Sequence, residues 1–379
     1  MKYFNNAGAS IVEDNVIDAQ IKYLQLEKKL GGYNAAIHEK EKIDSFYALS
    51  AKLLNCDKDE VLFVQSASVG WNIAIHGLPF SKNDTIITLD TEFGSNLIAI
   101  KQFSEKSKCN VEIIKTASDG SFELSKMEQI LKQCKGKKCI AISHAVAQGS
   151  IVYPVKEIGA LAKKYNAIYI VDGCQSIGQM SVDVKEIGCD ALMTSGRKWL
   201  RGPRGTGIMY VSKTSSLSPL FLDLSTSDLQ FDKNNAINGL LTRTDAKRFE
   251  LWEKPISAQL GLSVAIENYL KKDTNLINQQ SLNKALKIRE AVFNNPKYHP
   301  IGTLNAKTSI TGFYFNNDET LEKFKECMAD NNFELSYMSD WDFPLTFPKG
   351  VKNIVRIAPS YFTSDANVDE LIKLLKNFK

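Results

Sequence analysis

Two residues between positions 168 and 211 carry groups that could do chemistry together. Asp172 ends an apolar run, residues 168–171, and Lys198 comes shortly after a second run of strand-forming residues, 191–195. In open α/β sheets, ligands bind beyond the carboxyl ends of the strands, so both side chains are expected at one edge of a sheet. A lysine amine forms an imine with an aldehyde, and a carboxylate can keep a ring nitrogen protonated. The pair therefore predicts pyridoxal 5'-phosphate (PLP) chemistry, with Lys198 and Asp172 as catalytic residues.

Each residue of this pair also has a more ordinary explanation. An aspartate after a strand often caps a helix or forms a turn, and a single lysine is usually a surface charge. Gln175, Ser195 and Arg197 lie close to the pair in the sequence and add polar groups that a cofactor needs. The glycine-rich segment 202–207 lacks the Lys-Ser/Thr ending of a P-loop and is interpreted as a tight connection between strands. Together these neighbours favour a cofactor site over coincidence.

A phosphate-binding turn is predicted at residues 66–68. These residues directly follow a strand-like apolar run and open a helical pattern. Backbone N–H groups around Ala67, at the N-terminus of a helix, could bind a phosphate together with the Ser68 hydroxyl. A serine that only caps the helix explains the same residues. If the phosphate site exists, Ser195 and Arg197 would close it from the other side.

Alternating patterns along the chain predict an α/β fold. Up to about residue 255, short apolar runs with strand character alternate with segments of helical periodicity. Continuous apolar strands separated by helices argue for a mostly parallel sheet that is covered on both faces. Beyond that point, long helical patterns and a few strands indicate a smaller α+β domain. We expect an N-terminal segment near the active site (1–20), a large PLP-binding domain (21–255) and a small C-terminal domain (256–379).

Composition and charge narrow the possible partners. Of the 379 residues, 44% are hydrophobic and 24% are charged, which is ordinary for a soluble globular protein. The net charge of +4 is spread along the chain, so no nucleic-acid partner is expected. The seven cysteines form no CxxC pair and the four histidines are scattered, so no metal site is predicted. Without a signal-peptide core or an apolar run of ~20 residues, a cytoplasmic protein with no membrane contact is expected.

The motifs around these residues resemble the class-V aminotransferase-like family of PLP fold type I enzymes. That group includes cysteine desulfurases, selenocysteine lyases and isopenicillin N epimerase. The family pattern Asp-Gly-x-Gln occurs at residues 172–175, Ser-Gly-His-Lys at 195–198 and Gly-Pro-x-Gly at 202–205. The opening YFNNAGAS is similar to the family's substrate loop, FVQSASVGWN to its phosphate turn and VRIAPSYFTS to its carboxylate-binding segment. The resemblance extends over nearly the whole chain.

The resemblance implies a role for each matching residue. Lys198 would form the Schiff base, Asp172 would pair with the pyridine nitrogen, and Gln175 would hydrogen-bond the phenolic oxygen of the cofactor. The phosphate would be bound by Ala67, Ser68, Ser195 and Arg197. Arg356 would hold the α-carboxylate of an amino-acid substrate through its guanidinium fork, and Ala7 lies in the substrate loop.

Three positions depart from the family pattern. Arg197 replaces the histidine that usually precedes the lysine, so a donor is kept and a permanent charge is added. Phe93 stands where a ring-stacking histidine is usual. It can still stack on the cofactor but cannot move protons, which leaves proton transfer to Lys198. The family's asparagine near residues 139–146 has no obvious counterpart, and we assign Gln148 to the substrate site as its substitute.

The most consequential departure lies in residues 336–348 (SYMSDWDFPLTFP). Cysteine desulfurases carry a mobile nucleophilic cysteine in this segment, and here it has none. Cys327 precedes the segment in a predicted helix and Cys174 lies beside Gln175, so we interpret both as packing residues. A desulfurase needs an exposed thiolate to accept sulfur. We therefore expect a C–S or other β-elimination lyase, or an aminotransferase, acting at Cα of a small amino acid.

Several alternatives stay open. An amino-acid epimerase would begin with the same chemistry at Cα. A catalytically silent PLP-fold binding protein would have no reason to keep both Asp172 and Lys198. A Rossmann nucleotide-binding protein should carry GxGxxG after its first strand, and this chain does not. By analogy with the family we also expect a homodimer, in which a partner loop near residues 243–252 reaches the phosphate.

Overall fold

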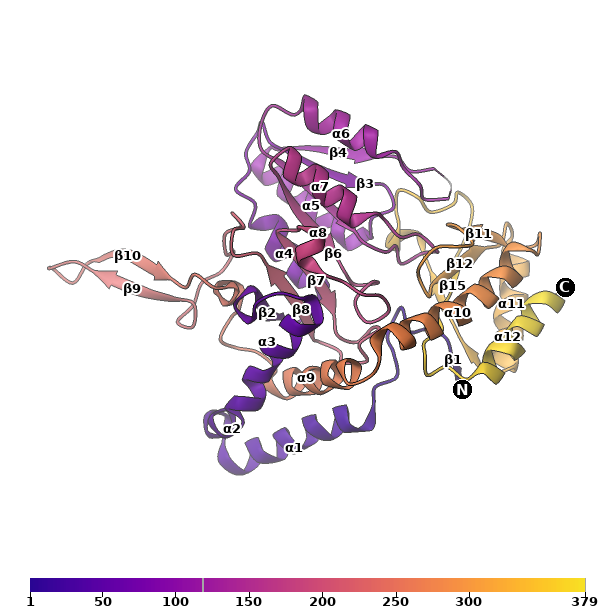
Figure 1. Cartoon of the computed structure of the whole chain (residues 1–379), viewed down its shortest axis with the longest axis horizontal. Coiled ribbons are helices and arrows are strands. Elements are labelled where there is room, and N and C mark those ends of the chain that lie inside the picture. Colours follow the sequence, from indigo (N-terminus) through magenta and orange to yellow (C-terminus); the bar gives the residue numbers. More distant parts are fainter. Residues whose placement is uncertain (118, 379) are drawn as a thin grey trace.

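The computed structural model describes residues 1–117 and 119–378, and its centre is a seven-stranded sheet (Figure 1). The strands are β2 (Val61–Val64), β3 (Thr85–Leu89), β4 (Asn110–Ile114), β5 (Lys138–Ser143), β6 (Ala167–Asp172), β7 (Ala191–Ser195) and β8 (Gly207–Val211). Their order across the sheet is β2-β8-β7-β6-β5-β3-β4. Neighbours from β7 to β4 run parallel, whereas β8 is antiparallel to both β7 and β2. The predicted mostly parallel α/β sheet is confirmed.

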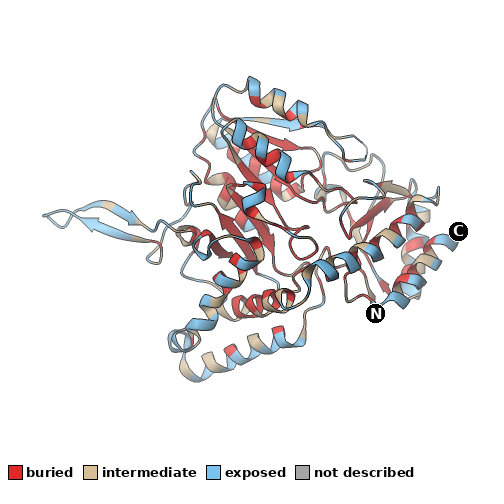
Figure 2. Ribbon diagram, in the orientation of Figure 1, coloured by how far each residue is buried: buried red, intermediate tan, exposed pale blue. Residues whose placement is uncertain are grey.

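The two faces of this sheet bury separate hydrophobic cores. On β6, Ile170 belongs to the core that includes α4 (Ala67–His76) and α5 (Gly94–Ser107), and Val171 belongs to the opposite core. That opposite core includes residues of α3 (Lys40–Leu54), α6 (Leu124–Gln133), α7 (Val155–Lys164), α8 (Val184–Ile187) and α9 (Ile256–Leu270). The central strands are buried on both sides (Figure 2). Burial on both faces explains why they read as continuous apolar runs.

The C-terminal part of the chain forms a second, antiparallel sheet. Its order is β11-β12-β15-β14, with bounds His299–Ile301, Thr311–Tyr314, Ile354–Ile357 and Ser336–Met338. A third core joins this sheet to α10 (Thr274–Phe293), α11 (Asp318–Asp330) and α12 (Asp365–Asn377). The N-terminal strand β1 (Lys2–Tyr3) pairs in parallel with β13 (Phe333–Glu334). The first residues of the chain are therefore attached to the C-terminal part.

The packing of α9 bears on the predicted division of the chain at residue 255. This helix lies beyond that division, yet its buried Leu262 and Ile266 belong to the core of the seven-stranded sheet. It also packs against α3 and against α1 (Asp14–Leu30). The packing favours a division between α9 and α10. The boundaries of the large and small domains stay a prediction.

A β-hairpin projects from the body of the molecule (Figure 1). Its strands β9 (Ser227–Phe231) and β10 (Ile237–Thr242) pair only with each other, and most of their residues are exposed. Sequence patterning does not predict this hairpin, because β10 (INGLLT) lacks the alternation of a half-buried strand. The remaining short elements are α2 (Gly32–His38), η1 (Lys58–Glu60), η2 (Ala246–Phe249) and η3 (Asp340–Asp342). None of the helices described in the structure is long and apolar enough to cross a membrane.

Candidate active site

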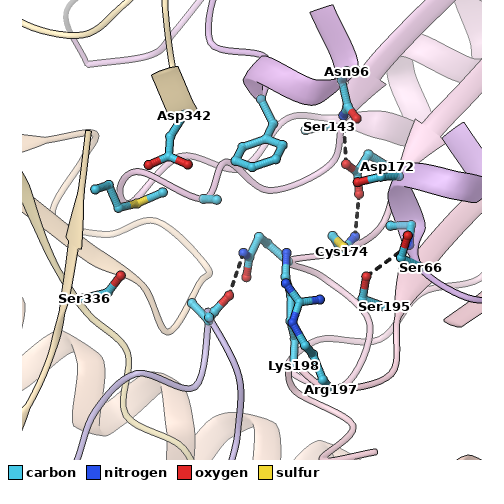
Figure 3. A pocket seen from close by; sticks show the side chains of 18 of the residues that line it. Ser66, Asn96, Ser143, Asp172, Cys174, Ser195, Arg197, Lys198, Ser336 and Asp342 are labelled. Atoms are coloured by element: carbon cyan, nitrogen blue, oxygen red, sulfur yellow. Dashed lines mark hydrogen bonds between the residues drawn. The ribbon is translucent and has the colours of Figure 1, made fainter. Parts of the chain in front are cut away.

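The carboxyl ends of three neighbouring strands lie around a cavity of about 480 Å³ (Figure 3). β5 ends at Ser143, β6 at Asp172 and β7 at Ser195, and all three residues line the cavity. Lys198 follows β7 by three residues and lines it as well. Parallel strands place their carboxyl ends at one edge of a sheet, which is why residues far apart in sequence meet here.

Nearly all residues that the sequence predicts for the site meet in this cavity. Its lining includes Ala7, Ala67, Ser68, Phe93, Asp172, Gln175, Ser195, Arg197, Lys198 and Arg356. Gln148 is the exception. Its side chain is buried outside the lining, and its amide donates to Thr346 Oγ1 at 3.1 Å. The structure therefore gives no support to Gln148 as a substrate ligand.

Asp172 is buried and is held by two hydrogen bonds. Its Oδ2 accepts from Asn96 Nδ2 at 2.9 Å, and its Oδ1 accepts from the Cys174 N–H at 2.8 Å. Both of these partners are neutral donors. A buried carboxylate with neutral partners favours a cation placed against it, and a protonated ring nitrogen is such a cation.

A second buried carboxylate, Glu92, lies beside Asp172. Asn96 Nδ2 donates to it at 3.0 Å as well as to Asp172, and the Ser143 N–H donates at 2.7 Å. Burial raises the pKa of Glu92 to about 7, with a further contribution from the negative charge of Asp172, while the hydrogen bonds from Ser143 and Asn96 oppose the increase. Asn96 therefore links the two carboxylates and fixes the orientation of Asp172.

The N-terminus of α4 lines the cavity, where the phosphate turn is predicted. Ser66 caps the helix, and the Ala67 N–H donates to Ser195 Oγ at 3.0 Å. Ser68 lines the cavity from the first turn, in which N–H groups have no acceptor within the helix. Arg197 also lines the cavity, and its Nε has no partner among the residues that the structure describes. First-turn N–H groups and a guanidinium are donors suited to a phosphate.

Gln175 is held at both ends of its side-chain amide. Its Oε1 accepts from Trp199 Nε1 at 2.9 Å, and its Nε2 donates to the Ala7 carbonyl oxygen at 3.0 Å. An amide nitrogen carries two hydrogens, so one more donor is available for an oxygen in the cavity. The same side chain therefore connects the N-terminal segment with the residue that follows Lys198.

Arg356, on β15, reaches the cavity from the second sheet. Its Nη2 donates to Ser336 Oγ at 3.2 Å and to Asn5 Oδ1 at 3.4 Å, and its Nη1 donates to the Ala147 carbonyl at 3.3 Å. Its Nε has no partner within the described part of the chain. Burial lowers the pKa of this guanidinium to about 10, and the carboxylate of Asp342 opposes that decrease. A buried arginine with a spare donor is suited to bind a substrate carboxylate.

One cysteine, Cys174, occurs among the described residues that line the cavity. It is only 8% exposed and packs in the core formed with α4 and α5. Cys327 lies on α11 outside the lining, and burial raises the pKa of its thiol. Residues 336–348 present Asp342 to the cavity instead of a thiol. Neither cysteine is placed as an exposed nucleophile beside Arg356.

The residues of the site that were not predicted from the sequence include Glu92, Asn96 and Asp342. Asn96 could have been found from its position, because it lies in the first turn of the helix that follows β3, at the sheet edge where Asp172 is expected. Asp342 carries no such signal. It lies in the short helix η3, and only the folded chain shows that it faces the cavity.

Comparison with known proteins places the chain in a family. The profile of the aminotransferase class-V family matches residues 2–371. The chain belongs to this family. Class-V aminotransferases use PLP, so the predicted cofactor and the predicted class of PLP-dependent enzyme are confirmed.

Curated class-V relatives of the chain include probable cysteine desulfurases. The one from Pyrococcus abyssi is 31% identical over 216 residues, which are 56% of this chain and 53% of that protein. The one from Methanothermobacter thermautotrophicus is 29% identical over 240 residues, which are 62% of this chain and 58% of that protein. The chain thus spans little more than half the length of these curated relatives.

Solved structures of class-V proteins share the fold. The apo cysteine desulfurase from Thermococcus onnurineus superposes with a TM-score of 0.87 at 22% identity and covers 99% of this chain and 93% of its own. The cystine C–S lyase C-DES, in complex with its product cysteine persulfide, has a TM-score of 0.85 at 18% identity and covers 100% and 97%. At these identities the likeness establishes the fold.

The polar groups of the cavity fit PLP. Asp172 has neutral partners and suits the protonated ring nitrogen, while the guanidinium of Arg197, which lines the cavity, suits the phosphate. Lys198 lines the same cavity and would hold the aldehyde of the cofactor. Phe93 lines one wall and offers a flat apolar surface for a ring.

Proposed function

We propose that the chain is a PLP-dependent C–S lyase, which eliminates the sulfur substituent from Cβ of a small amino acid without a nucleophilic cysteine of its own. The observation that carries this proposal is the substrate end of the cavity. There, Arg356 is available for an α-carboxylate and Asp342 occupies the segment where a desulfurase has its thiol. The names of the relatives support chemistry on sulfur amino acids, since they are cysteine desulfurases and a cystine C–S lyase.

Each residue would contribute one physical task. When bound, PLP withdraws electrons from Cα of an amino acid attached to it. Asp172 would keep the ring nitrogen protonated, and Asn96 would hold Asp172 in place. Arg356 would bind the α-carboxylate and so orient the bond between Cα and hydrogen. Lys198 would take the proton from Cα, because Phe93 has no group that can accept it.

The elimination balances without a redox partner. The proton on Cα goes to Lys198, the Cβ–S bond breaks, and its electron pair leaves with the sulfur as a thiolate. The three-carbon fragment takes up water and yields pyruvate and ammonia. Because sulfur leaves as a free thiol or persulfide, no thiolate of the enzyme is needed to receive it.

The test is a product analysis on the PLP-loaded protein. The protein is incubated with cysteine, cystine and S-alkylcysteines, and pyruvate, sulfide and thiols are measured. Pyruvate formed in equal amount to the released thiol supports the lyase. A keto acid formed only with an amino acceptor would identify an aminotransferase, and racemised substrate an epimerase. A persulfide on a cysteine of the enzyme would identify a desulfurase.

We further infer that the working form is a homodimer. The projecting hairpin exposes apolar side chains along both strands, among them Leu229, Phe231, Ile237, Leu240 and Leu241. An isolated two-stranded hairpin is marginally stable in water, and a partner surface would bury it. Residues 243–252, which follow the hairpin, include Trp252 at 62% exposure. A monomeric mass in light scattering at micromolar concentration would refute this inference.

A further inference from the structure

The segment that follows β14 forms one wall of the cavity. Its backbone packs tightly on the start of α5, since a Cβ on Gly94 would lie 2.2 Å from the carbonyl oxygen of Trp341. Phe343 is buried and packs edge-on against Phe93, with ring centroids 5.8 Å apart. This wall, residues 339–343, is therefore anchored to the part of the protein that holds the cofactor.

Asp342 points from this wall into the cavity (Figure 3). One of its carboxylate oxygens accepts from the Ser339 N–H at 3.0 Å. Within residues 1–117 and 119–378 it takes part in no salt bridge. Its negative charge nevertheless acts on Arg356, where it opposes the decrease in pKa that burial causes.

Apart from Arg204, which lines the cavity from an exposed position, the other charged side chains of the lining each match one group of the cofactor or the substrate. Asp172 matches the ring nitrogen, Lys198 the aldehyde, Arg197 the phosphate and Arg356 the α-carboxylate. Asp342 has no counterpart in PLP or in the amino-acid backbone. The part of the substrate that is left for it is the side chain.

The surroundings of Asp342 determine which side chain suits it. Met338, Phe343, Ala145 and Ala147 line the cavity and offer apolar surface for a thioether or disulfide. A substrate side chain that ends in an anionic group is repelled by the Asp342 carboxylate. One that ends in a neutral apolar group displaces water from the carboxylate and offers no hydrogen bond in its place. A side chain that ends in a cationic group forms an ion pair with the carboxylate.

We propose that Asp342 is a specificity residue, which selects sulfur amino acids whose side chain ends in a positively charged amino group. The proposal rests on the proposed lyase function and names the substrate class for it. In such a substrate Arg356 holds the α-carboxylate at one end and Asp342 holds the second ammonium group beyond the sulfur.

Three thioethers of similar length that differ in their terminal group test this selection. S-(2-aminoethyl)-L-cysteine ends in an ammonium group, S-propyl-L-cysteine in a methyl group and S-(2-carboxyethyl)-L-cysteine in a carboxylate. For each compound, kcat/KM is measured from pyruvate release by the PLP-loaded wild type, Asp342→Asn and Asp340→Asn. The amide of Asn can still accept from the Ser339 N–H, so the wall is kept. Asp340→Asn removes the same charge from an exposed position outside the cavity.

The expected result is a preference for the aminoethyl compound that depends on Asp342 alone. We expect Asp342→Asn to lower the ratio of aminoethyl to propyl kcat/KM by about tenfold or more, and Asp340→Asn to leave it unchanged. An unchanged ratio in Asp342→Asn overturns the proposal. So does an equal loss for all three compounds, which would show that the carboxylate acts only through Arg356.

A binding measurement separates this proposal from the lyase function. If the wild type releases no pyruvate from these three compounds, cysteine or cystine, the lyase function fails. Calorimetric dissociation constants of the same compounds with the same proteins then decide the role of Asp342. Tighter binding of the aminoethyl compound that is lost in Asp342→Asn supports it, and equal affinities overturn it.

Discussion

The two ends of the cavity are built in different ways. At the cofactor end, the functional groups come from adjacent strands of one parallel sheet, where Asp172 ends β6 and Lys198 follows β7. At the substrate end, Arg356 comes from the second sheet, Asp342 from the short helix η3 and Ala7 from the N-terminal segment. The cofactor end is formed by neighbouring strands, whereas the substrate end is formed by segments that are far apart in the sequence.

This difference separates the chemistry from its selectivity. The cofactor end is fixed by buried hydrogen bonds from Asn96 and the Cys174 N–H to Asp172, so its geometry leaves little freedom. The substrate end can change by substitution in residues 339–348, which follow β14, without disturbing the seven-stranded sheet. Changes at the first end should therefore remove the reaction, and changes at the second should alter which substrate is bound and how tightly.

The largest effect is expected for Lys198→Ala. Loss of the group that bonds the cofactor and moves the Cα proton should lower kcat by about a thousandfold or more. Borohydride reduction of the PLP-loaded wild type should attach the cofactor to Lys198, and the variant should carry no label while its circular dichroism is unchanged. Lys101→Ala, an exposed substitution on α5, is the matched control. A label retained in Lys198→Ala would place the bond elsewhere.

Asp172→Ala should rank second, through the cofactor. Removing the partner of a buried cation costs about 2–5 kcal/mol, so PLP should bind at least tenfold more weakly and the remaining holoenzyme should turn over slowly. Asp172→Asn keeps the shape but not the charge, and it separates the electrostatic part from packing. For both variants, fluorescence titration of the apoprotein with PLP measures the cofactor affinity, and steady-state kinetics of the holoenzyme measures turnover. Wild-type affinity and turnover in Asp172→Asn would exclude an ionic role for this carboxylate.

At the substrate end, Arg356→Ala should act on binding of the amino acid. The loss of a desolvated pair with the α-carboxylate should raise KM by an amount equivalent to about 2–4 kcal/mol, with PLP affinity unchanged. Arg356→Lys keeps the charge without the bidentate fork, and it should recover part of the loss. Steady-state kinetics at saturating PLP gives KM for the amino acid, and titration of the apoprotein with PLP gives the affinity for the cofactor. An unchanged KM would remove Arg356 from the substrate site, and a parallel loss of PLP affinity would move it to the cofactor end.

The same contrast explains how much the sequence could predict. Asp172, Ser195 and Lys198 are predictable because an apolar strand and the residue after it are visible in a short window, and parallel strands share an edge. The substrate role of Gln148 stays a prediction, and its buried position depends on the second sheet, since a Cβ on Gly312 would lie 1.8 Å from the Gln148 carbonyl oxygen. No local pattern reports such a contact.

Two other features were hidden for the same reason. α9 follows the predicted division at residue 255, and only its packing on α1 and α3 shows that it belongs with the larger sheet. Asp342 is one acid among many in the sequence, and its importance arises from a wall that is fixed by Gly94 and Phe93. In each case the deciding information is a contact between distant segments.

The smallest effect expected concerns Glu92 and sharpens the description of the cofactor end. Burial, and then Asp172, raise the pKa of Glu92 to about 7 in the folded protein, against an ordinary value of 4.5. Between these two pH values Glu92 holds a proton in the folded protein that the unfolded chain has released. The resulting contribution to the free energy of unfolding is fully present below pH 4.5 and is lost as the pH rises toward 7. The loss between pH 5 and 7 should be about 2 kcal/mol. Urea unfolding of the apoprotein should show this slope in the wild type and in Glu112→Gln, an exposed control, but not in Glu92→Gln. Identical slopes in all three proteins would mean that Glu92 is ionised throughout, with Asn96 shared between two charged carboxylates.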